Sequence, residues 1–127
     1  MKILIAEDSE LLRERLREAL SEIPDVEIVG EAENALAARH LIEKLEPDAV
    51  ILDIRMPGGN GIDVIYSIKK RHPNTVVIMF TGYPYPQYQK RCMELGADYF
   101  LDKSLGLKSI IRTLKKLICS QKVVSRE

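Results

Sequence analysis

Short apolar runs alternate with amphipathic patterns along the whole chain, and this alternation restricts the possible folds more than any other feature. Five runs have the apolar character of buried strands: residues 2–6, 27–32, 49–53, 75–81 and 99–102. Nearly continuous runs are typical of parallel strands covered on both faces. Between them, apolar residues recur every three or four positions, as in helices with one buried face. Strict alternation of strands and helices predicts an α/β fold, a parallel sheet with helices on both faces.

Local signals indicate where the predicted elements begin and end. Asn34 and Asn60 each precede a helical pattern, and asparagine is a favourable N-cap residue. The predicted apolar positions of the helix after Asn34 are Leu36, Leu41, Ile42 and Leu45. The last helical pattern ends near residue 120, so we expect one domain over residues 1–120 and a polar tail over residues 121–127.

Composition excludes several functional classes. The chain has 19 Lys and Arg residues and 19 Asp and Glu residues, so it lacks the basic excess that is usual in a nucleic-acid-binding domain. No apolar stretch approaches the length of a membrane span, and the N-terminus lacks the pattern of a signal peptide. We therefore expect a cytoplasmic protein that contacts neither a membrane nor, through this domain, a nucleic acid.

Polar residues follow four of the five predicted strands. Glu7 and Asp8 follow the first strand, Asp53 ends the third, Thr81 ends the fourth and Lys103 follows the fifth. The carboxyl ends of parallel strands meet at one edge of the sheet, where ligands gather, so we expect these side chains to converge. Three carboxylates in one pocket repel one another unless their pKa values rise or a cation enters. An oxygen-only ligand set favours Mg²⁺ over zinc.

A cation beside a fixed ammonium is the environment that phosphoryl transfer requires, because negative charge spreads over the phosphoryl oxygens. A carboxylate can act as the nucleophile and form an aspartyl phosphate. The central position of Asp53 makes it the best candidate. The Thr81 hydroxyl could donate to a phosphoryl oxygen, and Lys103 could neutralise charge.

Four motifs occur in the order and spacing of one known family. They are IAED at 5–8, LDIRMPG at 52–58, TG at 81–82 and GADYFLDK at 96–103. With these motifs the chain resembles the CheY-like receiver domains of two-component response regulators, over residues 2 to about 118. The resemblance implies a flavodoxin-like, doubly wound (βα)5 fold with strand order 2-1-3-4-5.

The resemblance also implies roles for individual residues. Asp53 would accept a phosphoryl group from a histidine on a sensor histidine kinase or a histidine phosphotransfer protein. Asp8, Asp53 and the backbone carbonyl of Arg55 would bind Mg²⁺, with Glu7 acting mainly through water. Lys103 would be the family's lysine of the active site.

Thr81 and Phe100 match the pair of residues that switches the surface of the family. Phe100 stands where tyrosine is frequent, so we expect its ring to be substantially inward before phosphorylation. Ser104 replaces the usual proline after Lys103, which predicts a trans peptide bond. The loop with Tyr83, Tyr85 and Tyr88 is unusual, and it is either a binding surface or a locally packed loop.

We therefore expect a phosphorylatable signalling module, not a turnover enzyme, that controls a downstream effector protein. The sequence ends soon after the fifth helix, which favours a stand-alone receiver. The alternative is the receiver of a longer DNA-binding transcription regulator. A flavin-binding electron carrier is disfavoured by the acidic residues after the first strand. An acid phosphatase of the aspartyl-phosphate type is disfavoured because Arg55 stands where a second aspartate is needed.

Overall fold

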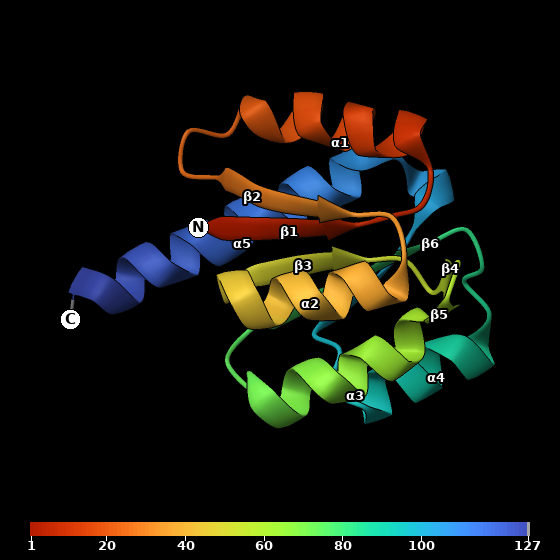
Figure 1. Cartoon of the computed structure of the whole chain (residues 1–127). Coiled ribbons are helices and arrows are strands. Elements are labelled where there is room, and N and C mark those ends of the chain that lie inside the picture. Colours follow the sequence, from red (N-terminus) through yellow and green to blue (C-terminus); the bar gives the residue numbers. More distant parts are fainter. Residues whose placement is uncertain (127) are drawn as a thin grey trace.

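The structure, a computed structural model, describes residues 1–126, with the side chains of residues 1–120. A five-stranded parallel sheet lies between two layers of helices (Figure 1). Its strands are β1 (Lys2–Ala6), β2 (Glu27–Ala32), β3 (Ala49–Leu52), β6 (Val76–Thr81) and β7 (Tyr99–Asp102). They are arranged in the order β2-β1-β3-β6-β7, which confirms the predicted 2-1-3-4-5 topology.

Two helices cover one face of the sheet and three cover the other. Helices α1 (Glu10–Ser21) and α5 (Leu107–Arg126) pack on one face, and α2 (Ala35–Leu45), α3 (Gly61–Arg71) and α4 (Pro86–Glu94) pack on the other (Figure 1). The burial of strand β1 on both faces explains why residues 3–6 are all apolar. Leu4 and Ala6 belong to the core under α2, α3 and α4, whereas Ile3 and Ile5 belong to the core under α1 and α5.

The buried face of α2 differs from the predicted one. Leu36 is 74% exposed, so its assignment to the apolar face is wrong. The residues of α2 that are buried are Ala35, Ala38 and Ile42. These positions follow the helical period, and the small alanines let α2 pack closely against the sheet, whereas Leu36 is rotated out of that stripe.

Three short elements were not predicted from the sequence. Strands β4 (Arg55–Met56) and β5 (Gly59–Asn60) form a small antiparallel pair directly after β3, and η1 (Lys103–Leu105) is a 3-10 turn after β7. Helix α5 continues to Arg126, so the backbone of the predicted tail is helical up to that residue. The domain boundary at residue 120 stays a prediction.

Every peptide bond in the described part of the chain is trans, including the one between Lys103 and Ser104, as expected from the sequence.

Of the helices in the described part of the chain, none combines the length and the apolar character that crossing a membrane requires.

Candidate functional site

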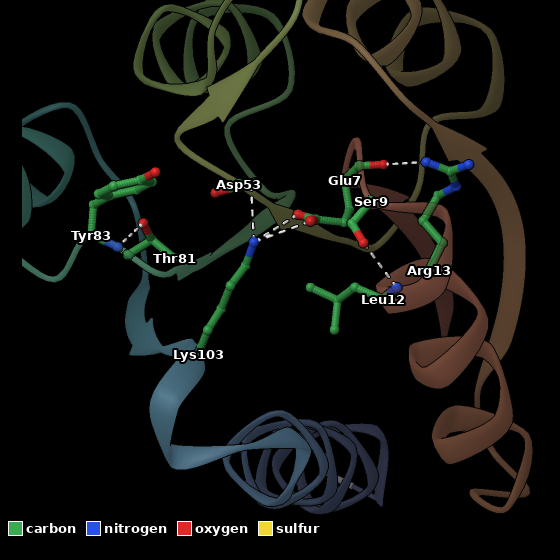
Figure 2. A network of polar contacts seen from close by, with 8 residues as sticks. All are labelled: Glu7, Ser9, Leu12, Arg13, Asp53, Thr81, Tyr83 and Lys103. Atoms are coloured by element: carbon green, nitrogen blue, oxygen red, sulfur yellow. Dashed lines mark hydrogen bonds and ion pairs between the residues drawn. The ribbon is translucent and has the colours of Figure 1, made fainter.

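The carboxyl ends of β1, β3 and β7 bring two carboxylates to one ammonium group. The Nζ atom of Lys103 lies 3.1 Å from both Oε1 and Oε2 of Glu7 and 3.0 Å from Oδ2 of Asp53 (Figure 2). Glu7 and Asp53 are buried, whereas Asp8 is exposed. The predicted convergence of Glu7, Asp53 and Lys103 is therefore confirmed.

Backbone contacts hold the two buried carboxylates in place. The N–H of Glu7 donates to the carbonyl of Ala32, and the N–H of Asp53 donates to the carbonyl of Ala6. On the other side of Glu7, Nη1 of Arg13 donates to the Glu7 carbonyl at 2.6 Å (Figure 2). Arg13 is a positioning residue that could not be predicted from the sequence, because an arginine on a surface helix carries no distinguishing signal.

Gly61, at the N-terminus of α3, supports the loop that follows Asp53. Its N–H donates to the carbonyl of Ile54 at 2.7 Å. A Cβ atom at this position would lie 2.0 Å from the backbone oxygen of Asp53, which no side chain can tolerate. The loop and the helix can approach this closely only because residue 61 is glycine. This close approach was not predicted from the sequence.

The pKa values at the site are shifted because two buried carboxyl groups, those of Glu7 and Asp53, lie beside one ammonium group. Burial, followed by repulsion from Asp53, raises the pKa of Glu7 to about 7, although Lys103 opposes the shift. Burial alone would lower the pKa of Lys103, but the charges of Asp53 and Glu7 together raise it. Lys103 therefore stays protonated at neutral pH. Its single positive charge does not balance all three carboxyl groups of the site, so a cation could neutralise the remaining negative charge.

The donor set fits a hard divalent cation. Carboxylate oxygens of Glu7, Asp8 and Asp53 lie within 4.8 Å of one another. Oδ1 of Asp53 is buried and has no hydrogen-bond partner, which is costly for a charged acceptor unless a ligand completes it. Three carboxylates without nitrogen or sulfur ligands suit Mg²⁺. The role of the Arg55 carbonyl as a further ligand stays a prediction.

The two residues of the predicted switch lie on neighbouring strands. Thr81 is fully buried, and its Oγ1 accepts a hydrogen bond of 2.9 Å from the N–H of Tyr83 (Figure 2). Phe100 pairs with Met79 across β6 and β7 and is half-buried against the core under α4. Its ring is thus not fully exposed. The switch roles of both residues stay predictions.

The rings of the tyrosine loop contact one another, and Tyr83 and Tyr85 are at the same time exposed, so both interpretations of the loop stay open. The ring of Tyr85 lies 6.3 Å from that of Tyr83 and 5.6 Å from that of Tyr88. The guanidinium of Arg55 lies 4.0 Å above the centre of the Tyr83 ring, and a hydrogen bond with Tyr88 raises the pKa of Arg55. Arg55 thus joins the loop after Asp53 to the loop after Thr81, a contact that was not apparent from residues so far apart in the sequence.

Comparisons with known proteins agree with this geometry. The family model of the response regulator receiver domain matches residues 3–115. Response regulator GacA of Pseudomonas aeruginosa is 26% identical over 98% of this chain, which spans only 58% of the length of GacA.

Two solved structures illustrate the structural similarity. A DNA-binding response regulator of the LuxR family from Staphylococcus aureus is 34% identical, with a TM-score of 0.85 over 91% of this chain and 96% of that one. A chain of the CheX–CheY–BeF3–Mg²⁺ complex from Borrelia burgdorferi is 25% identical, with a TM-score of 0.86 over 93% of this chain and 89% of that one.

Proposed function

The chain belongs to the response regulator receiver domain family, and we propose that it is a phosphoacceptor module of a two-component system that is phosphorylated on Asp53. The donor is a phosphohistidine on a sensor histidine kinase or a histidine phosphotransfer protein. The phosphorylated form acts on a downstream effector protein. The domain catalyses only its own phosphorylation and dephosphorylation, in the cytoplasm, where its free cysteines Cys92 and Cys119 stay reduced.

One observation carries this proposal. Asp53 is a buried carboxylate with one oxygen held by Lys103 and the other without any hydrogen-bond partner. A purely structural aspartate would have both oxygens satisfied. The free oxygen lies beside two further carboxylates and one fixed ammonium, which is an arrangement for accepting a phosphoryl group with a metal ion.

The chain's own residues account for the transfer. A lone pair of the Asp53 carboxylate forms the new O–P bond as the P–N bond of the donor breaks, and the electron pair of that bond stays on the imidazole nitrogen. The Lys103 ammonium balances charge on the phosphoryl oxygens. The Thr81 oxygen accepts from the N–H of Tyr83, so its own O–H remains available to donate to one of them.

Mg²⁺ would be held by Asp8, Asp53 and the backbone carbonyl of Arg55, with Glu7 acting through water. The chemistry that this ion supplies when bound is neutralisation of negative charge on the phosphoryl group. The solved relative from Borrelia burgdorferi has Mg²⁺ in its complex, which supports the choice of metal.

Intact-mass measurement tests the proposal. We expect the wild-type protein to gain one phosphoryl group when it is incubated with acetyl phosphate and Mg²⁺, and to gain none when EDTA replaces Mg²⁺. Asp53→Asn should gain none. The control variant Asp63→Asn, an exposed carboxylate at the start of α3, should behave as wild type. Equal labelling of Asp53→Asn would refute the assignment.

The alternative assembly is a receiver within a longer DNA-binding transcription regulator. It is favoured by the LuxR-family neighbour and by the greater length of GacA. The mass of the protein in its native cells distinguishes the two, because a DNA-binding domain would add substantially to the 14.4 kDa of this chain.

A further inference from the structure

A cavity separate from the phosphoacceptor site lies between α2 and α3. Its volume is about 290 Å³, and its walls come from both helices and from the residue that ends α3. Its lining includes Arg39, Ile42 and Glu43 from α2, and Tyr66, Lys70, Arg71 and His72 from α3 and its end. Helix α3 begins at Gly61, beside Asp53, and ends at Arg71. The cavity is therefore at the far end of this helix from Asp53, and both sites can be occupied at once.

One residue that lines the cavity has a buried polar atom without a hydrogen-bond partner. Among the side chains that the structure describes, two buried polar atoms have no hydrogen-bond partner. One is Oδ1 of Asp53, which belongs to the site described above. The other is Nε2 of His72. Leaving such an atom unpaired destabilises a protein, so the exceptions in a folded chain call for a partner from outside it.

The nearby carboxylate does not supply that partner. Oε1 of Glu43 lies 3.5 Å from Nε2 of His72, too far for a good hydrogen bond, and lies closer, at 3.0 Å, to Nη1 of Arg71. Glu43 is thus engaged by the arginine. An acceptor atom of a ligand could supply the hydrogen-bond partner that Nε2 of His72 lacks.

The charges and the apolar wall define what kind of ligand would enter. The lining has more basic than acidic residues, with Arg39, Lys70 and Arg71 on one side and Glu43 on the other. Its net positive charge favours an anion. The Tyr66 ring is 56% exposed, and Nζ of Lys70 lies 5.8 Å from its centre. Ile42 is buried and forms part of the apolar lining. A flat apolar body could pack against the tyrosine and the isoleucine.

We propose that this cavity binds a small aromatic anion, whose ring packs on Tyr66 and whose carboxylate or phosphate accepts a hydrogen bond from Nε2 of His72. A volume of about 290 Å³ suits one ring with one charged group. The ammonium of Lys70 adds attraction to the anionic group at the mouth of the cavity.

Ligand probes test this proposal by NMR titration of the ¹⁵N-labelled full chain. Benzoate carries both the ring and the charge, benzyl alcohol lacks the charge and acetate lacks the ring. We expect saturable shifts of amides at residues 39–43 and 66–72 with benzoate, and binding about tenfold weaker with the other two probes. Phenyl phosphate distinguishes a phosphate from a carboxylate as the preferred group. Equal affinity for benzoate and benzyl alcohol, or the absence of saturable shifts in these residues, would overturn the proposal.

Variants assign the binding to the named residues. Lys70→Met should weaken benzoate binding several-fold, whereas Lys44→Met, an exposed lysine on α2 outside the cavity, should not. His72→Phe keeps an aromatic ring but removes Nε2, so it should weaken the binding of benzoate more than that of benzyl alcohol, whose neutral hydroxyl accepts a weaker hydrogen bond than a carboxylate does. Benzoate affinity that is unchanged in both Lys70→Met and His72→Phe would contradict the proposed contacts. Phosphorylation of Asp53 is read out separately, so failure of one proposal leaves the other standing.

Discussion

At the scale of single residues, the site depends on two buried carboxylates that share one ammonium. Their identity was predictable, because Glu7, Asp53 and Lys103 follow strands whose carboxyl ends must meet. Their supports were not: Gly61 acts through a single close approach to Asp53, and Arg13 through one bond to a backbone carbonyl. Such contacts depend on interatomic distances between distant segments, which residue type and spacing do not encode.

The raised pKa of Glu7 makes the stability of the metal-free protein depend on pH. Its pKa is about 7 in the folded protein, whereas the ordinary pKa of a glutamate is 4.5, so between these pH values the folded state holds a proton that the unfolded state releases. The free energy of unfolding should therefore fall as pH rises from 4.5 to 7, by up to about 3 kcal/mol from this group. Glu7→Gln should lack this loss.

Urea unfolding in EDTA across this pH range measures the effect. The difference in unfolding free energy between wild type and Glu7→Gln should change with pH, whereas Glu10→Gln, an exposed control at the start of α1, should run parallel to wild type. Parallel profiles for Glu7→Gln as well would show that Glu7 does not hold a proton.

The close approach at Gly61 predicts a second effect. Gly61→Ala must push the backbone at Asp53 away, so it should cost about 1–3 kcal/mol of stability and slow phosphorylation by acetyl phosphate. At Gly82, a new Cβ would meet only Cδ of Lys103, at 3.9 Å. Gly82→Ala should therefore change the urea midpoint little. A Gly61→Ala variant as stable and as reactive as wild type is incompatible with this role.

At the scale of elements, the strands and the helix starts were predictable and the small elements were not. Asn34 and Asn60 cap α2 and α3 as expected, with side-chain oxygens that accept from the N–H groups of Ala37 and Ile62. The β4–β5 pair has strands of two residues each, too short for any periodic pattern. The prediction that Leu36 lies on the apolar face of α2 was wrong, because the size of an apolar side chain does not show which side of the helix meets the sheet.

Two variants of α2 test this description. Asn34→Ala removes the hydrogen bond of 2.7 Å to the N–H of Ala37 and should cost about 1 kcal/mol of unfolding free energy. Leu36→Ala should change it by no more than about 0.5 kcal/mol, since Leu36 is 74% exposed. Denaturant unfolding measures both. A loss at Leu36→Ala as large as that of a core leucine would restore the sequence-based assignment.

The switch is a prediction about β6 and β7 together. Phe100 is half-buried and has no hydroxyl, so its ring should already lie inward and move little when Asp53 is phosphorylated. Phe100→Tyr should enlarge the change, because the hydroxyl favours an outward position in the resting protein. The NMR shifts of the ring at position 100, measured with and without beryllofluoride as a mimic of the phosphoryl group, report how far the ring moves. Equal responses in both proteins would contradict a pre-biased switch.

At the scale of the whole molecule, the parallel topology is what creates the site. Strands β1, β3 and β7 are separated by long stretches of sequence, yet their carboxyl ends lie at one edge of the sheet and place Glu7, Asp53 and Lys103 in contact. The alternation of strands and helices was therefore sufficient to predict at which edge of the sheet the functional side chains lie. The contact of Arg55 with the tyrosine loop, and the cavity between α2 and α3, depend on side-chain packing that only the folded molecule shows.

Chemical mapping of the phosphoryl group identifies the residue that carries it. Borohydride reduces an aspartyl phosphate to homoserine, a change that peptide mass spectrometry locates to one residue. After incubation with acetyl phosphate and Mg²⁺, we expect homoserine at position 53 and aspartate unchanged at Asp8. Homoserine at Asp8 or elsewhere in place of Asp53, or a phosphoryl group that borohydride does not remove, would contradict the account.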